Sequence, residues 1–204
     1  RDFSILSDTL ASQFTARTQF DGKLLDFPSI ETAGLLSQNK ILAIQALVSM
    51  GIGLNPEKVA ESLKGALLTG RQQRAVYRGV NVLLDVAHNP AAASVLRQNI
   101  PAIKGKTYAV ASVLADKDWA GMIEQVADRL DELLVAEISD NPRASTAQSM
   151  LDMVYTTGLE ACRCDSIEDA FLKAIKVASA DDQIVVFGSF HTVSSVLKVI
   201  SEEV

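Results

Sequence analysis

The chain has 204 residues and a net charge of −6, with 48% hydrophobic and 22% charged residues. This composition is typical of a globular α/β protein and excludes a disordered or fibrous chain. No apolar run approaches the roughly 18 residues of a membrane span, and the negative charge disfavours a general nucleic-acid binder, which needs a basic face. We therefore expect a cytoplasmic protein with neither a membrane nor a nucleic acid among its partners.

The first part of the chain is predicted to combine a hairpin with helices. Asp21-Gly22 separates two extended segments and is a strong signal for a tight turn. Apolar residues at helical spacing then predict a helix from Leu35 to Met50. Asn55 is suited to cap a second helix, from Pro56 to Leu63, because proline is favoured in the first turn. We place a domain boundary near Leu67 to Arg71.

After this boundary, short apolar strands alternate with helices, beginning with a second hairpin at Arg78-Gly79. The predicted strands are Val80–Val86, Thr107–Leu114, Glu132–Ile138, Leu159–Cys164 and Gln183–Gly188. The predicted helices are Pro90–Asn99, Asp118–Leu130, Thr146–Tyr155, Ser166–Ala178 and Thr192–Ser201. Such alternation predicts βαβ units. The fold class is therefore α/β: residues 68–204 form a Rossmann-like, mostly parallel sheet with flanking helices, and residues 1–67 form an incomplete domain of a hairpin plus helices.

Candidate site residues are the polar side chains that follow the predicted parallel strands, because ligands bind beyond the carboxyl ends of such strands. The first strand end offers Asp85 and His88, and the last offers Ser189 and His191. Both histidines of the chain lie at such ends. The two intermediate strand ends add further polar residues, which are Ser112, Asp116, Lys117, Asp118 and the segment Ser139–Arg143.

Each candidate also has a structural interpretation. Asn89-Pro90 is a good helix start, with Asn as N-cap. Asp85 ends an apolar strand, and a buried unpaired carboxylate is costly, so its partner is a ligand hydroxyl, an arginine or a backbone amide. Arg71 either binds phosphate or is a surface charge. A single histidine at a strand end is more often structural, but two at one sheet edge favour a function.

Two further observations limit the chemistry. The sequence has no GxGxxG and no GxxxxGK[ST] motif, so it is suited to position a nucleotide and a second substrate without a loop that cradles phosphates. Cys162 and Cys164 are two residues apart in a predicted strand, which disfavours a mutual disulfide. Without histidines nearby they are also a poor metal site, and we expect reduced core cysteines.

Five short motifs occur in a characteristic order, and together they carry a family resemblance. They are GR at 70–71, DVAHNP at 85–90, LADKD at 114–118, NPRAST at 141–146 and GSFHTV at 188–193. This set resembles the C-terminal portion of the bacterial bifunctional dihydrofolate synthase/folylpolyglutamate synthases, within the Mur ligase superfamily. DVAHNP alone would indicate only the superfamily, whereas its combination with GSFHTV indicates the folate branch. The resemblance covers nearly the whole chain.

The resemblance implies an ATP-dependent ligase of folate biosynthesis. It would join L-glutamate to dihydropteroate, to tetrahydrofolate (poly)glutamates or to both through an acyl phosphate, with Mg²⁺ neutralising the phosphates. Residues 1–67 would be the end of the central ATP-binding domain and residues 68–204 the glutamate ligase domain. The glycine-rich loop and the magnesium ligands of the family lie N-terminal to the part seen here. We therefore predict no metal ligand in this chain, no ligation by it alone, and a monomer when the protein is full length.

The resemblance also implies roles for matching positions. The implied nucleotide contacts are those of Asn39 with adenine, Arg71 with the phosphates and Asp85 with the ribose hydroxyls. His88 would act at the reacting end, close to the phosphates and the incoming glutamate. Ser189 and His191 would hold the glutamate.

Two other functions stay open. The first is a Mur-type ligase that adds an amino acid to a peptidoglycan precursor, against which GSFHTV argues. The second is a non-catalytic domain that binds a nucleotide or an amino acid. The missing phosphate loop favours the latter if the chain is complete. The missing initiator Met and the incomplete first domain instead lead us to expect that the chain is part of a longer protein.

Overall fold

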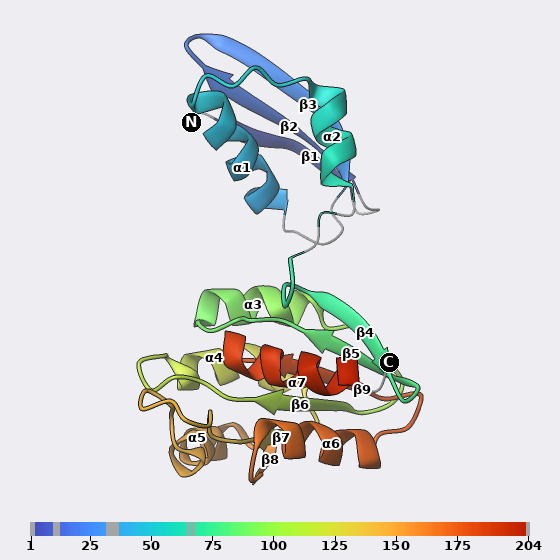
Figure 1. Ribbon diagram of the computed structural model, residues 1–204, viewed down its shortest axis with the longest axis vertical. Coiled ribbons are helices and arrows are strands. Elements are labelled where there is room, and N and C mark those ends of the chain that lie inside the picture. The colour runs from blue at the N-terminus through green and yellow to red at the C-terminus, as the bar shows by residue number, and fades with distance from the viewer. Residues whose placement is uncertain (1–2, 10–12, 32–36, 65, 67, 203–204) are drawn as a thin grey trace. The chain divides into compact units, whose positions relative to one another are not determined.

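The computed structural model describes residues 3–9, 13–31, 37–64, 66 and 68–202, so Leu35 and Leu67, at which a predicted helix and the predicted boundary begin, lie outside the described residues. The chain divides into two units, Arg1–Thr69 and Gly70–Val204 (Figure 1). In the described residues the first unit has one hydrophobic core, and the second unit has one on each face of its sheet. No helix in the described part of the chain is long and apolar enough to cross a membrane.

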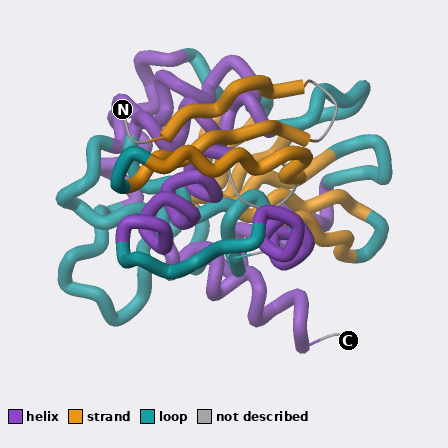
Figure 2. The backbone as a smooth tube through the Cα atoms, turned by 90° about the horizontal axis from the view of Figure 1, so that it is seen from above, coloured by secondary structure: helices purple, strands orange, loops and turns teal. Residues whose placement is uncertain are grey.

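The first unit is a three-stranded antiparallel sheet with two helices packed on it. Its strands are β1 (Phe3–Thr9), β2 (Gln13–Phe20) and β3 (Lys23–Glu31), and its helices are α1 (Ser37–Ser49) and α2 (Pro56–Leu63). The three strands lie side by side in Figure 2. Asp21 and Gly22 join β2 to β3 with φ angles of 48° and 72°. Two successive positive φ angles are typical of a type I′ hairpin turn, which confirms the predicted hairpin.

The second unit contains a six-stranded sheet in the order β4-β5-β9-β6-β7-β8. Its strands are β4 (Gln73–Tyr77), β5 (Val80–Leu84), β6 (Thr107–Ala111), β7 (Glu132–Val135), β8 (Glu160–Arg163) and β9 (Gln183–Phe187). β4 pairs with β5 in antiparallel fashion, and the other four pairings are parallel. All residues of β6 and β9 are buried, as expected for central strands covered on both faces. The predicted α/β fold with a mostly parallel sheet is confirmed.

Helices cover both faces of this sheet (Figure 1). They are α3 (Pro90–Asn99), α4 (Trp119–Val126), α5 (Ala147–Val154), α6 (Ile167–Val177) and α7 (Phe190–Glu202), with short 3-10 turns η1 (Ala127–Arg129) and η2 (Tyr155–Thr157). One core joins the sheet to α6 and α7, and the other joins it to α3, α4 and α5. The central strand β9 supplies Ile184 and Val186 to the first core, and Val185 and Phe187 to the second, because side chains alternate along a strand.

Five predicted element ends in the second unit lie two or more residues from those in the structure; two of them are the ends of β5 and β7, which stop at Leu84 and Val135 rather than at Val86 and Ile138. β6 ends at Ala111 rather than at Leu114, because the chain leaves the sheet and Leu114 instead pairs with Ala144 in an isolated bridge. α7 begins at Phe190 rather than at Thr192, because its first turn is capped by Ser189, a polar residue outside the apolar pattern of the helix. α4 ends at Val126 and continues only as the turn η1.

Candidate functional site

The candidate site lies where β5 and β9 end, on the carboxyl edge of the second sheet. These strands are parallel neighbours. Beyond them, the Asp85 amide donates to Val186 O at 2.9 Å, and the Gly188 amide donates to Ala87 O at 2.9 Å. The segment that carries Asp85 and His88 is therefore bonded to the segment that leads into α7. The predicted convergence of the first and last strand ends is present in the structure.

Asp85 is only 7% exposed, and both of its carboxylate oxygens accept backbone hydrogen bonds. Oδ1 accepts from the Ala87 amide at 2.8 Å and Oδ2 from the Gln72 amide at 3.0 Å. Burial raises the pKa of Asp85, and these two amides, followed by the charges of Arg71 and His88, oppose that shift. Among the partners that the sequence left open, the structure supplies backbone amides. Each oxygen keeps lone pairs with which it can accept a further bond.

His88 is half-buried and held by one ring nitrogen. Its Nδ1 lies 2.8 Å from Val86 O. A carbonyl oxygen only accepts, so Nδ1 carries a proton, and Nε2 of the neutral ring is left with a free lone pair. The next residue, Asn89, caps α3 by accepting from the Ala92 amide at 2.9 Å. The capping interpretation of Asn89-Pro90 is thereby confirmed.

Phe190, the first residue of α7, connects two of the candidates. The Arg71 guanidinium carbon lies 5.8 Å from the centroid of its ring. The ring of His88 lies 6.4 Å away, centroid to centroid, at an interplanar angle of 38°. The sequence places Phe190 at the last strand end, within GSFHTV, but sequence reasoning assigned it no role. The available signal was its position between the two candidate residues Ser189 and His191. Arg71, Asp85 and His88 are thus brought together, with Phe190 beside two of them.

Ser189 is buried and organises the start of α7. Its Oγ accepts from the Thr192 amide at 3.0 Å and lies 2.7 Å from Thr192 Oγ1. Thr192 Oγ1 donates its single proton to Ser112 O at 2.9 Å, so Ser189 must donate in the hydroxyl pair. The proton of Ser189 is therefore committed to the helix start. One Oγ lone pair stays available, and the predicted glutamate contact stays a prediction.

His191 is exposed and lies beside the loop that follows β7. Its Nε2 is 3.3 Å from Nδ2 of Asn141. An amide nitrogen donates, so Nε2 is the acceptor here. Asn141 Oδ1 in turn accepts from the Arg143 amide at 3.0 Å. The structure thus joins the last strand end to the third one through His191, and the predicted contact with glutamate is not tested by this geometry.

The intermediate strand ends are joined by surface charges. The Asp116 carboxylate is 2.9 Å from Lys117 Nζ and 2.8 Å from Arg143 Nη2. These two cations lower the pKa of Asp116 to about 2. Asp118 caps α4 by accepting from the Gly121 amide at 2.9 Å. Asp118 therefore has a structural role at the start of α4.

Asn39 lies in the other unit, on the first turn of α1, and is exposed. Its neighbour Lys40 is 1% exposed, and its Nζ donates to Glu31 O at 2.5 Å. Burial lowers the pKa of Lys40. The adenine contact of Asn39 stays a prediction.

The histidine, cysteine and acidic side chains of the described residues are the candidate metal ligands. They form no group of three or more that can hold a metal ion. Both cysteines are free, and burial raises the pKa of Cys164 to about 12. Cys162 is exposed, so its predicted core position is wrong; it lies on β8, at the edge of the sheet.

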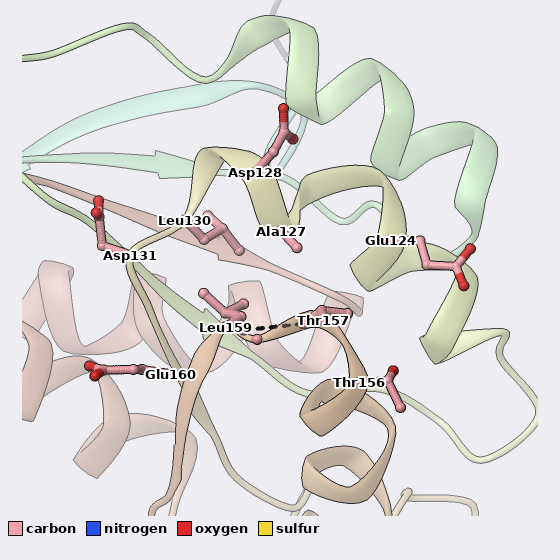
Figure 3. Close-up of a pocket in the computed structure, with 10 residues that line it drawn as sticks. Glu124, Ala127, Asp128, Leu130, Asp131, Thr156, Thr157, Leu159 and Glu160 are labelled. Atoms are coloured by element: carbon pink, nitrogen blue, oxygen red, sulfur yellow. Dashed lines mark hydrogen bonds between the residues drawn. The ribbon is translucent and has the colours of Figure 1, made fainter.

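A pocket at the opposite edge contains none of the predicted site residues (Figure 3). It lies where β7 and β8 begin, since Asp131 precedes one strand and Glu160 opens the other. Its acidic lining includes Glu124 and Asp128, and Asp128 is neutralised in part by a salt bridge to Arg97. Because parallel α/β sheets bind ligands at the carboxyl edge, we assign no role in the reaction to this pocket.

Ser112 allows us to test how a buried hydroxyl without a hydrogen-bond partner affects the stability of the second unit. It is fully buried, and its Oγ has no hydrogen-bond partner within the described residues. Ser112→Ala is expected to leave stability unchanged or to raise it by about 1 kcal/mol, because an unsatisfied buried hydroxyl is removed. Thr192→Val, which removes a bonded hydroxyl, is the control and is expected to cost about 1–2 kcal/mol. Urea denaturation measures both, and a loss at Ser112 would show that its hydroxyl is bonded.

Comparisons with known proteins identify the family of the unit that carries this site. Residues 70–190 match the family described as Mur ligase, glutamate ligase domain. The dihydrofolate synthase/folylpolyglutamate synthase of Escherichia coli K12 is 34% identical over 164 residues, which is 79% of this chain and 37% of that protein. The UDP-N-acetylmuramoyl-L-alanyl-D-glutamate–2,6-diaminopimelate ligase of Clostridium tetani is 31% identical over 169 residues, which is 78% of this chain and 34% of that protein.

Solved structures of the folate enzymes match nearly the whole chain. E. coli FolC in complex with DHPP and ADP has a TM-score of 0.84 at 27% identity, covering 99% of this chain and 46% of that one. A bifunctional folylpolyglutamate synthase/dihydrofolate synthase with Mn, AMPPNP and L-glutamate bound has a TM-score of 0.83 at 28% identity, covering 98% and 46%. The chain thus spans less than half the length of the relatives it matches. The predicted resemblance is confirmed, and the chain belongs to the Mur ligase family through its glutamate ligase domain.

Proposed function

We propose that this chain is the C-terminal part of an ATP-dependent ligase that adds L-glutamate to dihydropteroate, to tetrahydrofolate (poly)glutamates or to both. One observation carries the proposal: Arg71, Asp85 and His88 meet at the carboxyl edge of a glutamate ligase domain. The nucleotides and glutamate bound in the similar structures support ATP and L-glutamate as substrates. On this proposal residues 1–67 are the end of the central ATP-binding domain, and residues 68–204 are the glutamate ligase domain.

The nucleotide would be held by groups with complementary chemistry. Asp85 has lone pairs left after its two amide bonds, and these suit the donor hydroxyls of a ribose. None of the ion pairs in the described part of the chain involves Arg71, so its guanidinium is available to phosphate oxygens. Asn39 would contact the adenine.

His88 is the group that we assign to the reacting end. In the second half-reaction the glutamate amine forms a C–N bond as the C–O bond to phosphate breaks, and the nitrogen must lose a proton. Because Nδ1–H is fixed on Val86 O, the Nε2 lone pair can accept that proton. Ser189, through its remaining lone pair, and the exposed ring of His191 would hold the glutamate amino and carboxylate groups.

On our proposal, the residues that bind Mg²⁺ and cradle the phosphates are not in this chain. As the family resemblance implies, the ligands of Mg²⁺ and the loop that cradles the phosphates would belong to a preceding segment. The isolated chain would therefore not ligate, and the complete protein would be a cytoplasmic monomer. The similarity to a diaminopimelate-adding ligase keeps a peptidoglycan precursor as the second candidate acceptor.

An acceptor panel tests this function. The complete gene product that carries this chain is incubated with ATP, Mg²⁺ and radiolabelled L-glutamate, together with dihydropteroate, tetrahydrofolate or a UDP-muramoyl peptide. We expect labelled product from one or both pterins, with one ADP and one phosphate released per amide formed. Label in the muramoyl peptide alone would support the second candidate. Nucleotide binding without any ligation would indicate a non-catalytic binding domain.

A further inference from the structure

Phe190 and Tyr155 are the two strongly exposed aromatic residues in the described part of the second unit, and Phe190 is the one that lacks a polar group on its ring. Tyr77, Tyr108, Trp119, Phe171 and Phe187 are all at most 6% exposed, whereas Phe190 is 61% exposed. Its helix buries Thr192, Val193 and Val196 instead. An exposed phenylalanine gives up most of the stabilisation that burial of its ring would supply. Core packing therefore does not explain the residue.

The backbone that carries Phe190 is nevertheless held firmly. Gly188 is bonded to Ala87, Ser189 caps the helix, and Thr192 is bonded to Ser112 across the sheet. The ring therefore projects from a fixed point at the carboxyl edge.

The ring also touches two site residues that come from different segments. Arg71 precedes β4, and His88 lies between β5 and α3. In the described part of the chain the Arg71 guanidinium stacks on Phe190, and its charge also acts on Asp85. A long arginine side chain without a partner samples many rotamers. A cation–π contact selects those that lie over the ring.

We infer that Phe190 is a positioning residue for the proposed ligase: its ring holds the Arg71 guanidinium and packs beside His88, so that both face the nucleotide phosphates. This inference rests on the proposed function. Phe190 does not touch the reacting atoms, and it acts on ATP through Arg71. Its loss therefore matters only while Arg71 is present.

A double-mutant cycle tests this coupling, with the KM for ATP and kcat measured in the complete gene product. Phe190→Leu keeps an apolar side chain but removes the π face. We expect it to raise the KM for ATP by about two- to fivefold, the factor that corresponds to an exposed cation–π contact. Phe190→Trp offers a stronger π face, and this variant is expected to keep the wild-type KM for ATP. Adding Phe190→Leu to Arg71→Ala should change the KM no further.

Two controls separate positioning from folding. Tyr155→Leu makes the same kind of change at a residue that is 86% exposed and lies in η2, and it is expected to leave the KM unchanged. In the 204-residue chain, the Arg71 Nε–H resonance reports the contact without activity. Phe190→Leu should remove its ring-current shift, and Phe190→Trp should keep a shift.

The outcomes are distinguishable. Additive effects of Arg71→Ala and Phe190→Leu would overturn the inference, because Phe190 would then act independently of Arg71. An effect of Arg71→Ala with none of Phe190→Leu would overturn it as well, while leaving the proposed function intact. No effect of Arg71→Ala on the KM for ATP would remove the phosphate role of Arg71, and with it both the nucleotide assignment and the inference.

Discussion

Asp85→Ala is expected to raise the KM for ATP by roughly tenfold or more and to lower the stability of residues 70–204 by about 1–3 kcal/mol. The kinetic effect follows from the proposed ribose contact. The loss of stability follows from the amides of Gln72 and Ala87, which lose their acceptors. Gln72 has a φ angle of 47°, in the left-handed region, and its bond to Asp85 helps to hold that conformation.

A deoxynucleotide separates the two roles of Asp85. With the wild-type protein, 2′,3′-dideoxy-ATP should have a higher KM than ATP, and in Asp85→Ala the two nucleotides should become alike. If the substitution raises both KM values by the same factor, Asp85 is only a structural anchor. Denaturant unfolding of each variant supplies the stability term separately.

Asp182 is a matched control for the anchoring role. Its carboxylate also accepts two backbone amides, those of Ser179 at 2.7 Å and Lys106 at 2.6 Å, but at the amino end of β9. Asp182→Ala should therefore destabilise the unit while leaving the KM for ATP unchanged. Both substitutions deprive two backbone amides of their acceptor, one pair at each edge of the sheet, and Asp182→Ala also removes the acceptor of Ser179 Oγ at 2.8 Å.

The same pair gives opposite pH dependences. Burial raises the pKa of Asp85 above its ordinary value of 3.8, so the folded state binds a proton more readily than the unfolded chain. The contribution of Asp85 to the free energy of unfolding therefore increases as the pH falls from the raised pKa towards 3.8. Backbone hydrogen bonds lower the pKa of Asp182, so its contribution is present above 3.8 and is lost on acidification. Unfolding free energies of both alanine variants between pH 7 and 3 would check these signs.

The contrast between these two carboxylates also shows what the sequence can and cannot predict. The alternation of strands and helices predicted the parallel sheet, and the strand-end rule placed Asp85 and His88 at its carboxyl edge. The amides that satisfy Asp85 were not predictable, because Gln72 comes from a segment before β4 whose position depends on tertiary packing. Burial, and hence the direction of each pKa shift, is likewise a property of the assembled sheet.

The start of α7 gives a second example. The apolar pattern predicts a helix from Thr192, since Val193 and Val196 face the core. The true first turn is fixed by Ser189, Thr192 and Ser112, whose hydroxyl and carbonyl groups meet only after β6 and β9 have paired. That turn decides where Phe190 and His191 project, so the helix could be predicted but its contribution to the site could not.

Gly188→Ala is expected to lower stability by about 2–4 kcal/mol and to impair the complete enzyme. Gly188 has a φ angle of 111°, which residues with a Cβ rarely adopt. An added Cβ would lie 2.5 Å from Ser112 O and 3.1 Å from Val113 Cγ1. The first of these neighbours is backbone at the end of β6, so the chain itself must shift.

The backbone shift caused by Gly188→Ala would affect two segments of the site. Gly188 precedes the first turn of α7, which carries Ser189, Phe190 and His191, and its amide is bonded to Ala87, next to His88. We therefore expect kcat to fall and the KM for ATP to rise together. Gly158→Ala is the control: its φ angle is 73° and no atom lies within 4 Å of the added Cβ, so it should cost about 1 kcal/mol and leave kcat unchanged. Equal stability losses for the two variants would show that the contact with β6 does not constrain this turn.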